Sequence, residues 1–143
     1  MQYVYAATLQ LDPDGGYVVT FPDVPEAITH GRDRADAIAS GSEALGLALR
    51  GILLDGHDLP QPKAAGADLV PVPVDAGDAM KLALVEAFRQ SGMSKTEFAR
   101  RLGKAETEAR RILDPDHPTK LSTMQEALAA LGKAVVVSVR DAA

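Results

Sequence analysis

The stretch Ser94–Leu113, SKTEFARRLGKAETEARRIL, constrains the fold of this chain more than any other segment. Ser94 and Glu97 match the S-x-x-E pattern of a capping box, which satisfies free N–H groups at the start of a helix. Apolar side chains then recur at helical spacing, at Phe98, Ala99 and Leu102. Gly103 ends this helix, because glycine adopts a positive φ without a Cβ penalty. We therefore expect two short helices joined by a tight turn, the second over about 105–113.

The spacing of small and apolar residues resembles the helix-turn-helix of bacterial repressors. Ala99 allows the two helices to approach, Gly103 follows four residues later, and Ile112 anchors the second helix. In that family the second helix enters the major groove of DNA. The alternative is a helical hairpin with no role in DNA binding.

The repressor resemblance implies which side chains contact DNA. Phosphate contacts are expected from Lys95, Thr96 and Arg100, and Lys104 adds positive charge in the turn. Base contacts are expected from the outward positions of the second helix, at Glu106, Thr107, Arg110 and Arg111. Arginine suits guanine through its bidentate fork, and glutamate accepts from cytosine N4. An equal alternative for Glu106 is that it only favours the positive end of the helix dipole.

Charge is distributed unevenly along the 143 residues, which carry a net charge of −5. Residues 1–79 hold 4 Lys/Arg and 12 Asp/Glu, a net charge of −8. Residues 80–143 hold 11 Lys/Arg and 8 Asp/Glu, a net charge of +3. This asymmetry predicts an acidic module joined to a basic module.

The acidic half begins with strand patterns and continues with a helix. In residues 3–11 two sets of side chains alternate with a period of two, and their β-rich composition predicts a strand. The turn-forming run 12–16 separates this strand from a second strand over Tyr17–Phe21. We expect a third, short strand over Ala27–His30. Asp33 is a good N-cap for a helix that reaches about Leu54.

These elements resemble the N-terminal domain of HicB-type antitoxins in order and spacing. The matching motifs are D-x-D-G-G-Y at Asp12–Tyr17, F-P-D-x-P at Phe21–Pro25, T-x-G at Thr29–Gly31 and P-x-P at Pro60–Pro62. The resemblance implies a truncated RNase H-like domain over residues 1–74, a small antiparallel sheet with one helix. In this family a segment such as 69–74 completes the sheet, and its prolines restrict it to an edge.

The same resemblance implies a protein partner, a small basic ribonuclease of the HicA toxin type. Candidate toxin-binding residues lie in the rigid loop after the second strand, at Asp23, Val24, Pro25 and Glu26. A strongly negative domain would also steer a cationic partner and speed association. The alternative for these residues is a merely solubilising surface.

The C-terminal part, residues 75–143, is predicted to be an all-α helix-turn-helix bundle that ends in a β-strand. Its first helix starts at Asp75 or Asp78. A capping box at Ser122 and Gln125 predicts a further helix, and Ala134–Val139 has the composition of a strong strand. We expect this strand to pair with its copy in a second chain, giving a homodimer or higher oligomer. The alternative is pairing within its own chain.

No pattern for catalysis or cofactor binding is present in the sequence. Asp12, Asp14 and Asp23 fall at turns, where aspartate bonds locally, and the three histidines lack metal-ligand spacing. The absence of cysteine is typical of a reducing cytoplasm. No leader segment and no apolar run near 18 residues is evident, so we expect no membrane association. A nuclease is the least favoured hypothesis.

The leading hypothesis is an α+β antitoxin that blocks a HicA-type toxin sterically and represses its own operon by binding operator DNA. The alternative is a stand-alone helix-turn-helix repressor whose N-terminal domain senses a ligand or oligomerises.

Overall fold

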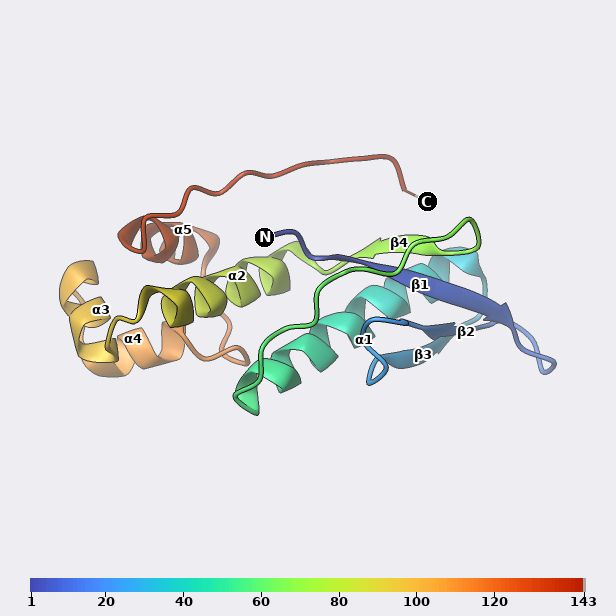
Figure 1. Ribbon diagram of the computed structural model, residues 1–143, viewed down its shortest axis with the longest axis horizontal. Helices are drawn as coiled ribbons and strands as arrows, with labels where there is room; N and C mark the ends of the chain where they lie inside the picture. The colour runs from blue at the N-terminus through green and yellow to red at the C-terminus, as the bar shows by residue number, and fades with distance from the viewer. Residues whose placement is uncertain (143) are drawn as a thin grey trace. The chain divides into compact units, whose positions relative to one another are not determined.

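The computed structural model describes residues 1–142, which form two compact units, 1–79 and 80–142. The described residues contain four strands and five helices in the order β1-β2-β3-α1-β4-α2-α3-α4-α5 (Figure 1). The predicted α+β class is confirmed. The division into a toxin-binding and a DNA-binding domain stays a prediction.

A small antiparallel sheet forms the first unit, with the strand order β3-β2-β1-β4. Its strands are β1 (Val4–Leu11), β2 (Tyr17–Thr20), β3 (Ile28–Gly31) and β4 (Val70–Pro73). The predicted hairpin and third strand are confirmed. Among the described strands, β4 pairs only with β1 and so lies at an edge of the sheet. An edge strand tolerates proline, which has no N–H, because its outward positions need not donate to a neighbouring strand.

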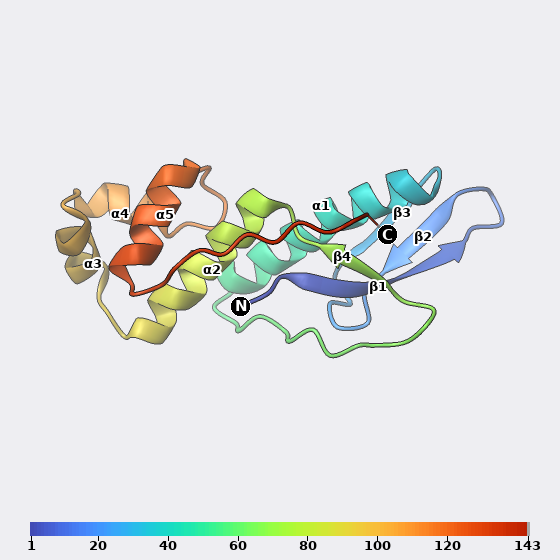
Figure 2. The same ribbon diagram turned by 90° about the horizontal axis from the view of Figure 1, so that it is seen from above.

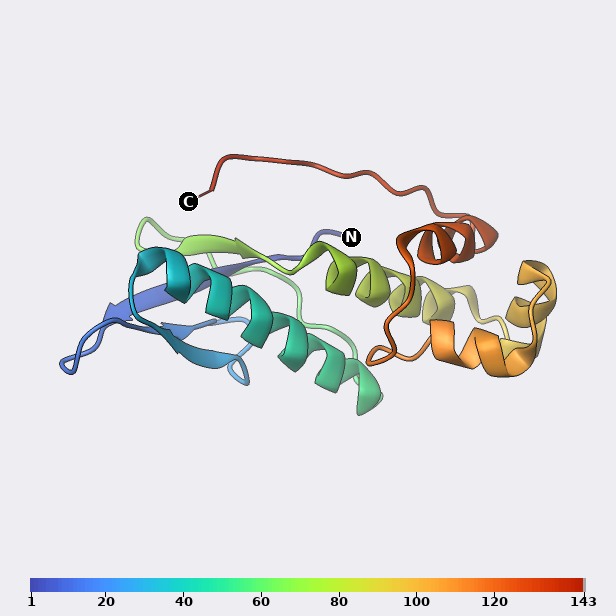
Figure 3. The same ribbon diagram turned by 180° about the vertical axis from the view of Figure 1, so that it is seen from behind.

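Helix α1 (Arg34–Leu54) packs across one face of the sheet (Figure 3). The Asp33 carboxylate accepts a hydrogen bond from Asp36 N at 2.9 Å, which confirms the predicted N-cap. The residues that α1 buries lie mostly at intervals of four, at Ala37, Gly41, Leu45, Leu49 and Leu53. A Cβ on Gly41 would lie 3.3 Å from Val19 Cγ1, so this glycine allows the helix to approach the sheet closely.

The length and apolar composition of α1 would allow it to cross a membrane. A helix that covers a sheet has the same composition, because one of its faces must be apolar. Because α1 packs on the sheet, its length and composition are weak evidence for a membrane span.

An irregular connection of residues 55–69 links α1 to β4 (Figure 2). Tyr5 Oη donates a hydrogen bond to Pro60 O at 2.7 Å and ties this connection to the sheet. The next helix, α2 (Ala76–Ser91), directly follows Asp75, one of the two predicted starts, whose carboxylate accepts from Gly77 N at 3.0 Å. Asp78, the other predicted start, instead pairs with Arg50 Nη1 at 2.6 Å.

The second unit is a helical bundle around an apolar core. Helices α3 (Lys95–Leu102), α4 (Glu106–Ile112) and α5 (Leu121–Ala130) pack with residues of α2. The core is built from small and aliphatic residues and one aromatic pair, with Phe88 and Phe98 centroids 5.4 Å apart. The predicted pair of short helices after Ser94 is confirmed.

Two predictions for the second unit are wrong. Ser122 does not cap α5, which begins at Leu121 after Lys120 with no side-chain cap, so Ser122 is already the second residue of the helix. Ala134–Val139 is not a strand in the described chain, and Val136, Val137 and Val139 are 89%, 77% and 92% exposed. A strand needs a hydrogen-bonded neighbour, and the described residues supply none to this segment. Pairing between two chains stays a prediction.

Candidate functional site

The α3–α4 pair is fixed at its start and at its turn by local hydrogen bonds. Ser94 Oγ accepts from Glu97 N at 3.1 Å, which is one half of the predicted capping box. Gly103 adopts φ 65°, and the next residue, Lys104, donates its N–H to Ala99 O at 3.0 Å. The chain therefore leaves α3 through a left-handed glycine and enters α4 three residues later.

Apolar residues on the inner sides of α3 and α4 decide which side chains face outward. Phe98 and Ala109 are fully buried, and Ala99 and Ile112 are 5% and 3% exposed. Because successive helical residues diverge by about 100°, burial of these positions turns the intervening polar residues toward solvent.

The predicted DNA-binding residues gather on the outside of this helix pair. All are exposed except Lys104, which is half-buried: Lys95, Thr96, Arg100, Glu106, Thr107, Arg110 and Arg111. They come from α3, α4 and the turn between them, so one compact motif carries the whole set.

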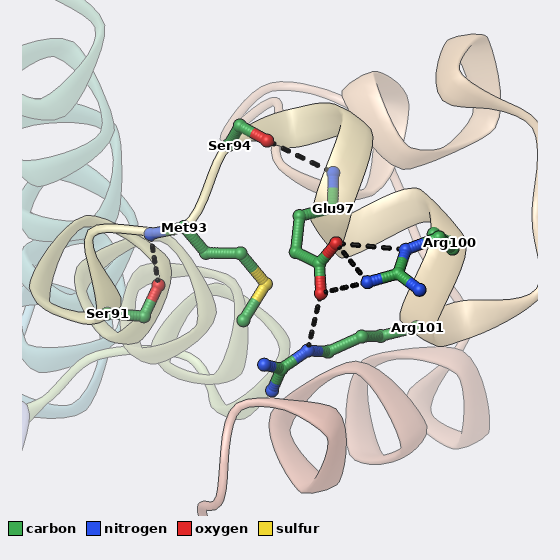
Figure 4. A network of polar contacts seen from close by, with 6 residues as sticks. All are labelled: Ser91, Met93, Ser94, Glu97, Arg100 and Arg101. Atoms are coloured by element: carbon green, nitrogen blue, oxygen red, sulfur yellow. Dashed lines mark hydrogen bonds and ion pairs between the residues drawn. The ribbon is translucent and has the colours of Figure 1, made fainter.

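Most of the cations in this motif are paired with glutamates of the same motif. The Glu97 carboxylate accepts from Arg100 Nη2 at 2.6 Å and from Arg101 Nε at 3.2 Å (Figure 4). These hydrogen bonds, first from Arg100 and then from Arg101, hold the pKa of Glu97 below its usual range. The Glu97 carboxylate is therefore directed to these arginines, and it does not accept from the Ser94 N–H, the second hydrogen bond of a complete capping box.

Two further ion pairs lie on α4 and at its start. Arg110 Nη2 lies 2.8 Å from Glu106 Oε1, and Lys104 Nζ lies 3.4 Å from Glu108 Oε1. Exposed pairs of this kind contribute about 0.2–1 kcal/mol each, so a phosphate or a base can replace them at small cost. Arg111 makes no ion pair with any residue in the range 1–142, which leaves its guanidinium available.

A buried lysine beneath α4 is not among the residues predicted from the sequence. Lys81 of α2 is 4% exposed, and its Nζ donates to Ile112 O at 2.8 Å and Thr119 Oγ1 at 2.5 Å. Desolvation lowers the pKa of Lys81 to about 8, against the opposing charge of Asp114. The only signal in the sequence is that Lys81 shares the apolar face of α2 with Leu84 and Val85.

The four candidate toxin-binding residues differ in their burial and in their contacts. Asp23 Oδ2 accepts from Lys63 N at 2.8 Å and Ala64 N at 2.7 Å, so this carboxylate holds the α1–β4 connection. Val24 has no exposed surface, which corrects its prediction as a contact, because the tight turn folds it into the core. Pro25 and Glu26 are exposed.

The fold and the site together define a two-unit α+β protein whose second unit presents cations on a short helix pair. A family model described as HicB_like antitoxin of bacterial toxin-antitoxin system matches residues 4–83. This range covers the sheet, α1 and the start of α2.

Curated relatives match across both units. Antitoxin HicB of Escherichia coli K12 is 37% identical over 129 residues, which cover 90% of this chain and 94% of the relative. Antitoxin HicB 1 of Photorhabdus laumondii is 36% identical over 135 residues, covering 94% and 86%. Antitoxin HicB 2 of the same organism is 40% identical over 118 residues, covering 82% and 84%.

This chain belongs to the HicB-like antitoxin family of bacterial toxin–antitoxin systems. Membership implies an antitoxin role with a toxin as partner, and it suggests a regulatory protein without catalytic activity.

Proposed function

We propose that this antitoxin neutralises a HicA-type, mRNA-cleaving toxin through residues 1–74 and represses its own operon through residues 75–143. The first unit would cover the toxin's active site sterically, and the second would bind operator DNA as a helix-turn-helix. Both activities would take place in the cytoplasm, where mRNA and operator DNA lie, without a membrane and without a cofactor.

The arrangement of α3 and α4 is the observation that carries the DNA-binding part. Ala109 and Ile112 anchor α4 on the core, while Arg110 and Arg111 project from it. This geometry is what a recognition helix needs, because its outer face must reach base edges while its inner face holds its angle. Residues 80–143 also carry the positive net charge of the chain, which favours contact with phosphates.

Family membership and charge support the toxin-binding part. Residues 1–79 carry a net charge of −8, and a ribonuclease needs a cationic surface to hold RNA. The four-stranded sheet covered by α1 is consistent with a truncated RNase H-like domain. Within the loop after β2, Pro25 and Glu26 are the exposed candidates for contact.

Dimerisation is part of the same proposal. Val136, Val137 and Val139 are exposed, and a second chain would supply the hydrogen-bonded neighbour that a strand over residues 134–139 needs. A two-fold dimer would place two α4 helices on half-sites about one helical turn apart, which predicts a palindromic operator.

The decisive experiment is co-expression of this chain with its neighbouring reading frames, followed by purification and mass measurement. We expect a small basic protein to co-purify and the complex to bind DNA from upstream of the operon. Recovery of the antitoxin alone, with intact DNA binding, would favour the stand-alone repressor. A purified complex that contains the toxin but does not bind the operator DNA would overturn the repressor role.

A further inference from the structure

The sheet has one face covered by α1 and one outer face, which we define as the side chains of β1–β4 that point away from α1. Side chains alternate between the two faces of a strand. On the α1 side, Tyr5, Ala7, Val19 and Val72 are at most 2% exposed. Their neighbours along each strand are half-buried or exposed, so the outer face is accessible.

The strand register shows which outer side chains lie together. Across β1, β2 and β3, the register aligns Thr8 with Thr20 and Ile28, and Gln10 with Val18 and His30. The hydroxyl groups of Thr8 and Thr20 hydrogen-bond each other, which confirms that they share a face. Ile28 is 65% exposed at the edge of this surface.

The surface continues on the other side of β1 with the same chemistry. Ala6 is opposite Pro71, and Val4 is opposite Pro73, and both prolines are exposed. None of these outer positions is Asp, Glu, Lys or Arg. A sheet face that meets only water is normally polar. Here four polar side chains, Thr8, Gln10, Thr20 and His30, share the face with apolar ones such as Ile28, so the face has the mixed, uncharged character of a contact surface.

Acidic residues lie at both ends of the strands that carry this uncharged centre. Asp12 and Asp14 lie in the turn after β1, Glu26 precedes β3, and Asp75 follows β4. Arg32, which follows β3, is paired with Asp36 at 3.3 Å. A centre depleted of charge and a charged rim are the anatomy of a protein–protein interface. The acidic rim suits a cationic partner, and two copies of this face would instead bring like charges together.

We propose that the outer face of the sheet, centred on Thr8, Thr20 and Ile28, is the surface on which the toxin docks. The partner is a cationic protein with an uncharged patch that covers the strands and basic groups that meet the rim. This inference rests on the proposed toxin-binding function and identifies the surface that performs it. The loop residues Pro25 and Glu26 then lie at the border of the interface.

The test compares two substitutions at side chains of nearly equal exposure. Ile28→Arg adds a positive charge to the outer face, and Leu47→Arg makes the matched change on α1, where Leu47 is 63% exposed. Because both side chains already face solvent, neither change should prevent folding, and thermal unfolding checks this. The probe is an inactivated HicA-type toxin from the neighbouring reading frame, titrated calorimetrically into each full-length variant. A third variant, Gln10→Arg, places the charge on β1.

We expect Ile28→Arg and Gln10→Arg each to weaken toxin binding at least tenfold and Leu47→Arg to change it less than twofold. Unchanged binding by both outer-face variants, or an equal loss with Leu47→Arg, would overturn the docking surface while toxin binding itself stands. If the unaltered chain does not bind the toxin, the proposed function fails and this inference fails with it. A decrease in self-association caused by Ile28→Arg, with toxin binding unchanged, would assign the face to a second copy instead.

Discussion

The ammonium group of Lys81 lies 2.8 Å from the carbonyl oxygen of Ile112, the last residue of α4. A helix ends with carbonyl groups that have no partner within the helix, and a cation near them also interacts favourably with the helix dipole. Thr119 Oγ1 accepts from the same ammonium at 2.5 Å, so Lys81 also holds the loop that follows α4. A residue of α2 therefore fixes the end of the helix that we propose to read DNA.

Replacing Lys81 with Met keeps an unbranched side chain of similar length and removes the donor. The carbonyl of Ile112 then loses this partner, and an unsatisfied buried polar group costs about 1–3 kcal/mol. We expect Lys81→Met to lower the free energy of unfolding by about that amount, measured by urea denaturation. Faster amide exchange at Ile112 and Leu113 would locate the effect at the end of α4. Equal or greater stability of the variant would show that relief of the buried charge dominates.

The stability that Lys81 contributes should depend on pH. Its pKa is about 8 in the folded chain, because burial disfavours the charged form, and it returns toward 10.5 on unfolding. Between these values the unfolded chain binds more protons than the folded chain, so stability rises with pH. We expect the difference in unfolding free energy between the unaltered chain and Lys81→Met to grow between pH 8 and pH 10, by at most about 1.4 kcal/mol per unit. A difference that stays constant or falls would contradict the buried ammonium.

The two serines in capping-box patterns should behave differently. Ser94→Ala removes the acceptor for Glu97 N and should cost about 1 kcal/mol of stability, as N-cap serines typically do. Ser122→Ala is the control, because Ser122 lies inside α5 and makes no cap. Chemical denaturation of both variants compares them directly. A similar loss in Ser122→Ala would mean that Ser122 is the N-cap and that α5 starts two residues later than the structure shows.

The outward arginines of α4 should control DNA binding without affecting the toxin. Replacing Arg110 and Arg111 with Ala removes two groups able to contact bases, each contributing about 1–3 kcal/mol of discrimination. We expect operator binding in a fluorescence titration to weaken at least tenfold at fixed salt. Arg32→Ala with Lys63→Ala removes the same charge from the first unit and serves as the control. Simultaneous loss of toxin binding in the Arg110/Arg111 variant would argue against separate functions of the two units.

Replacement by alanine should change the stability of the chain in opposite directions at two glycines. Gly16 has φ 75°, and a Cβ there would lie 2.3 Å from Gly31 O, so Gly16→Ala should destabilise the chain by at least about 1 kcal/mol. Gly51 lies inside α1, and a methyl group added there would meet nothing within 4 Å, so Gly51→Ala should stabilise by up to about 1 kcal/mol. Thermal unfolding measures both changes, and a stabilising Gly16→Ala would contradict the tight approach of the β1–β2 turn to β3.

Local signals in the sequence were enough to predict most elements. Asp33, Ser94 and Gly103 act within a few residues of themselves, as an N-cap, an N-cap and a helix end, and each does so in the structure. The alternation in β1 and the turn after it act over an equally short range. The capping pattern at Ser122 failed because two residue types at a fixed spacing also occur by chance inside a helix.

The sequence by itself determined the α+β class, the positions of turns and caps, and the uneven charge of the two halves, because each depends on residue type over a short span. Tertiary structure alone decided that Asp23 binds the α1–β4 connection, that Val24 is buried, and that Lys81 lies under the end of α4. These roles join residues about 30 to 40 positions apart, and burial and hydrogen bonding at such separations are set only when the helices and strands pack.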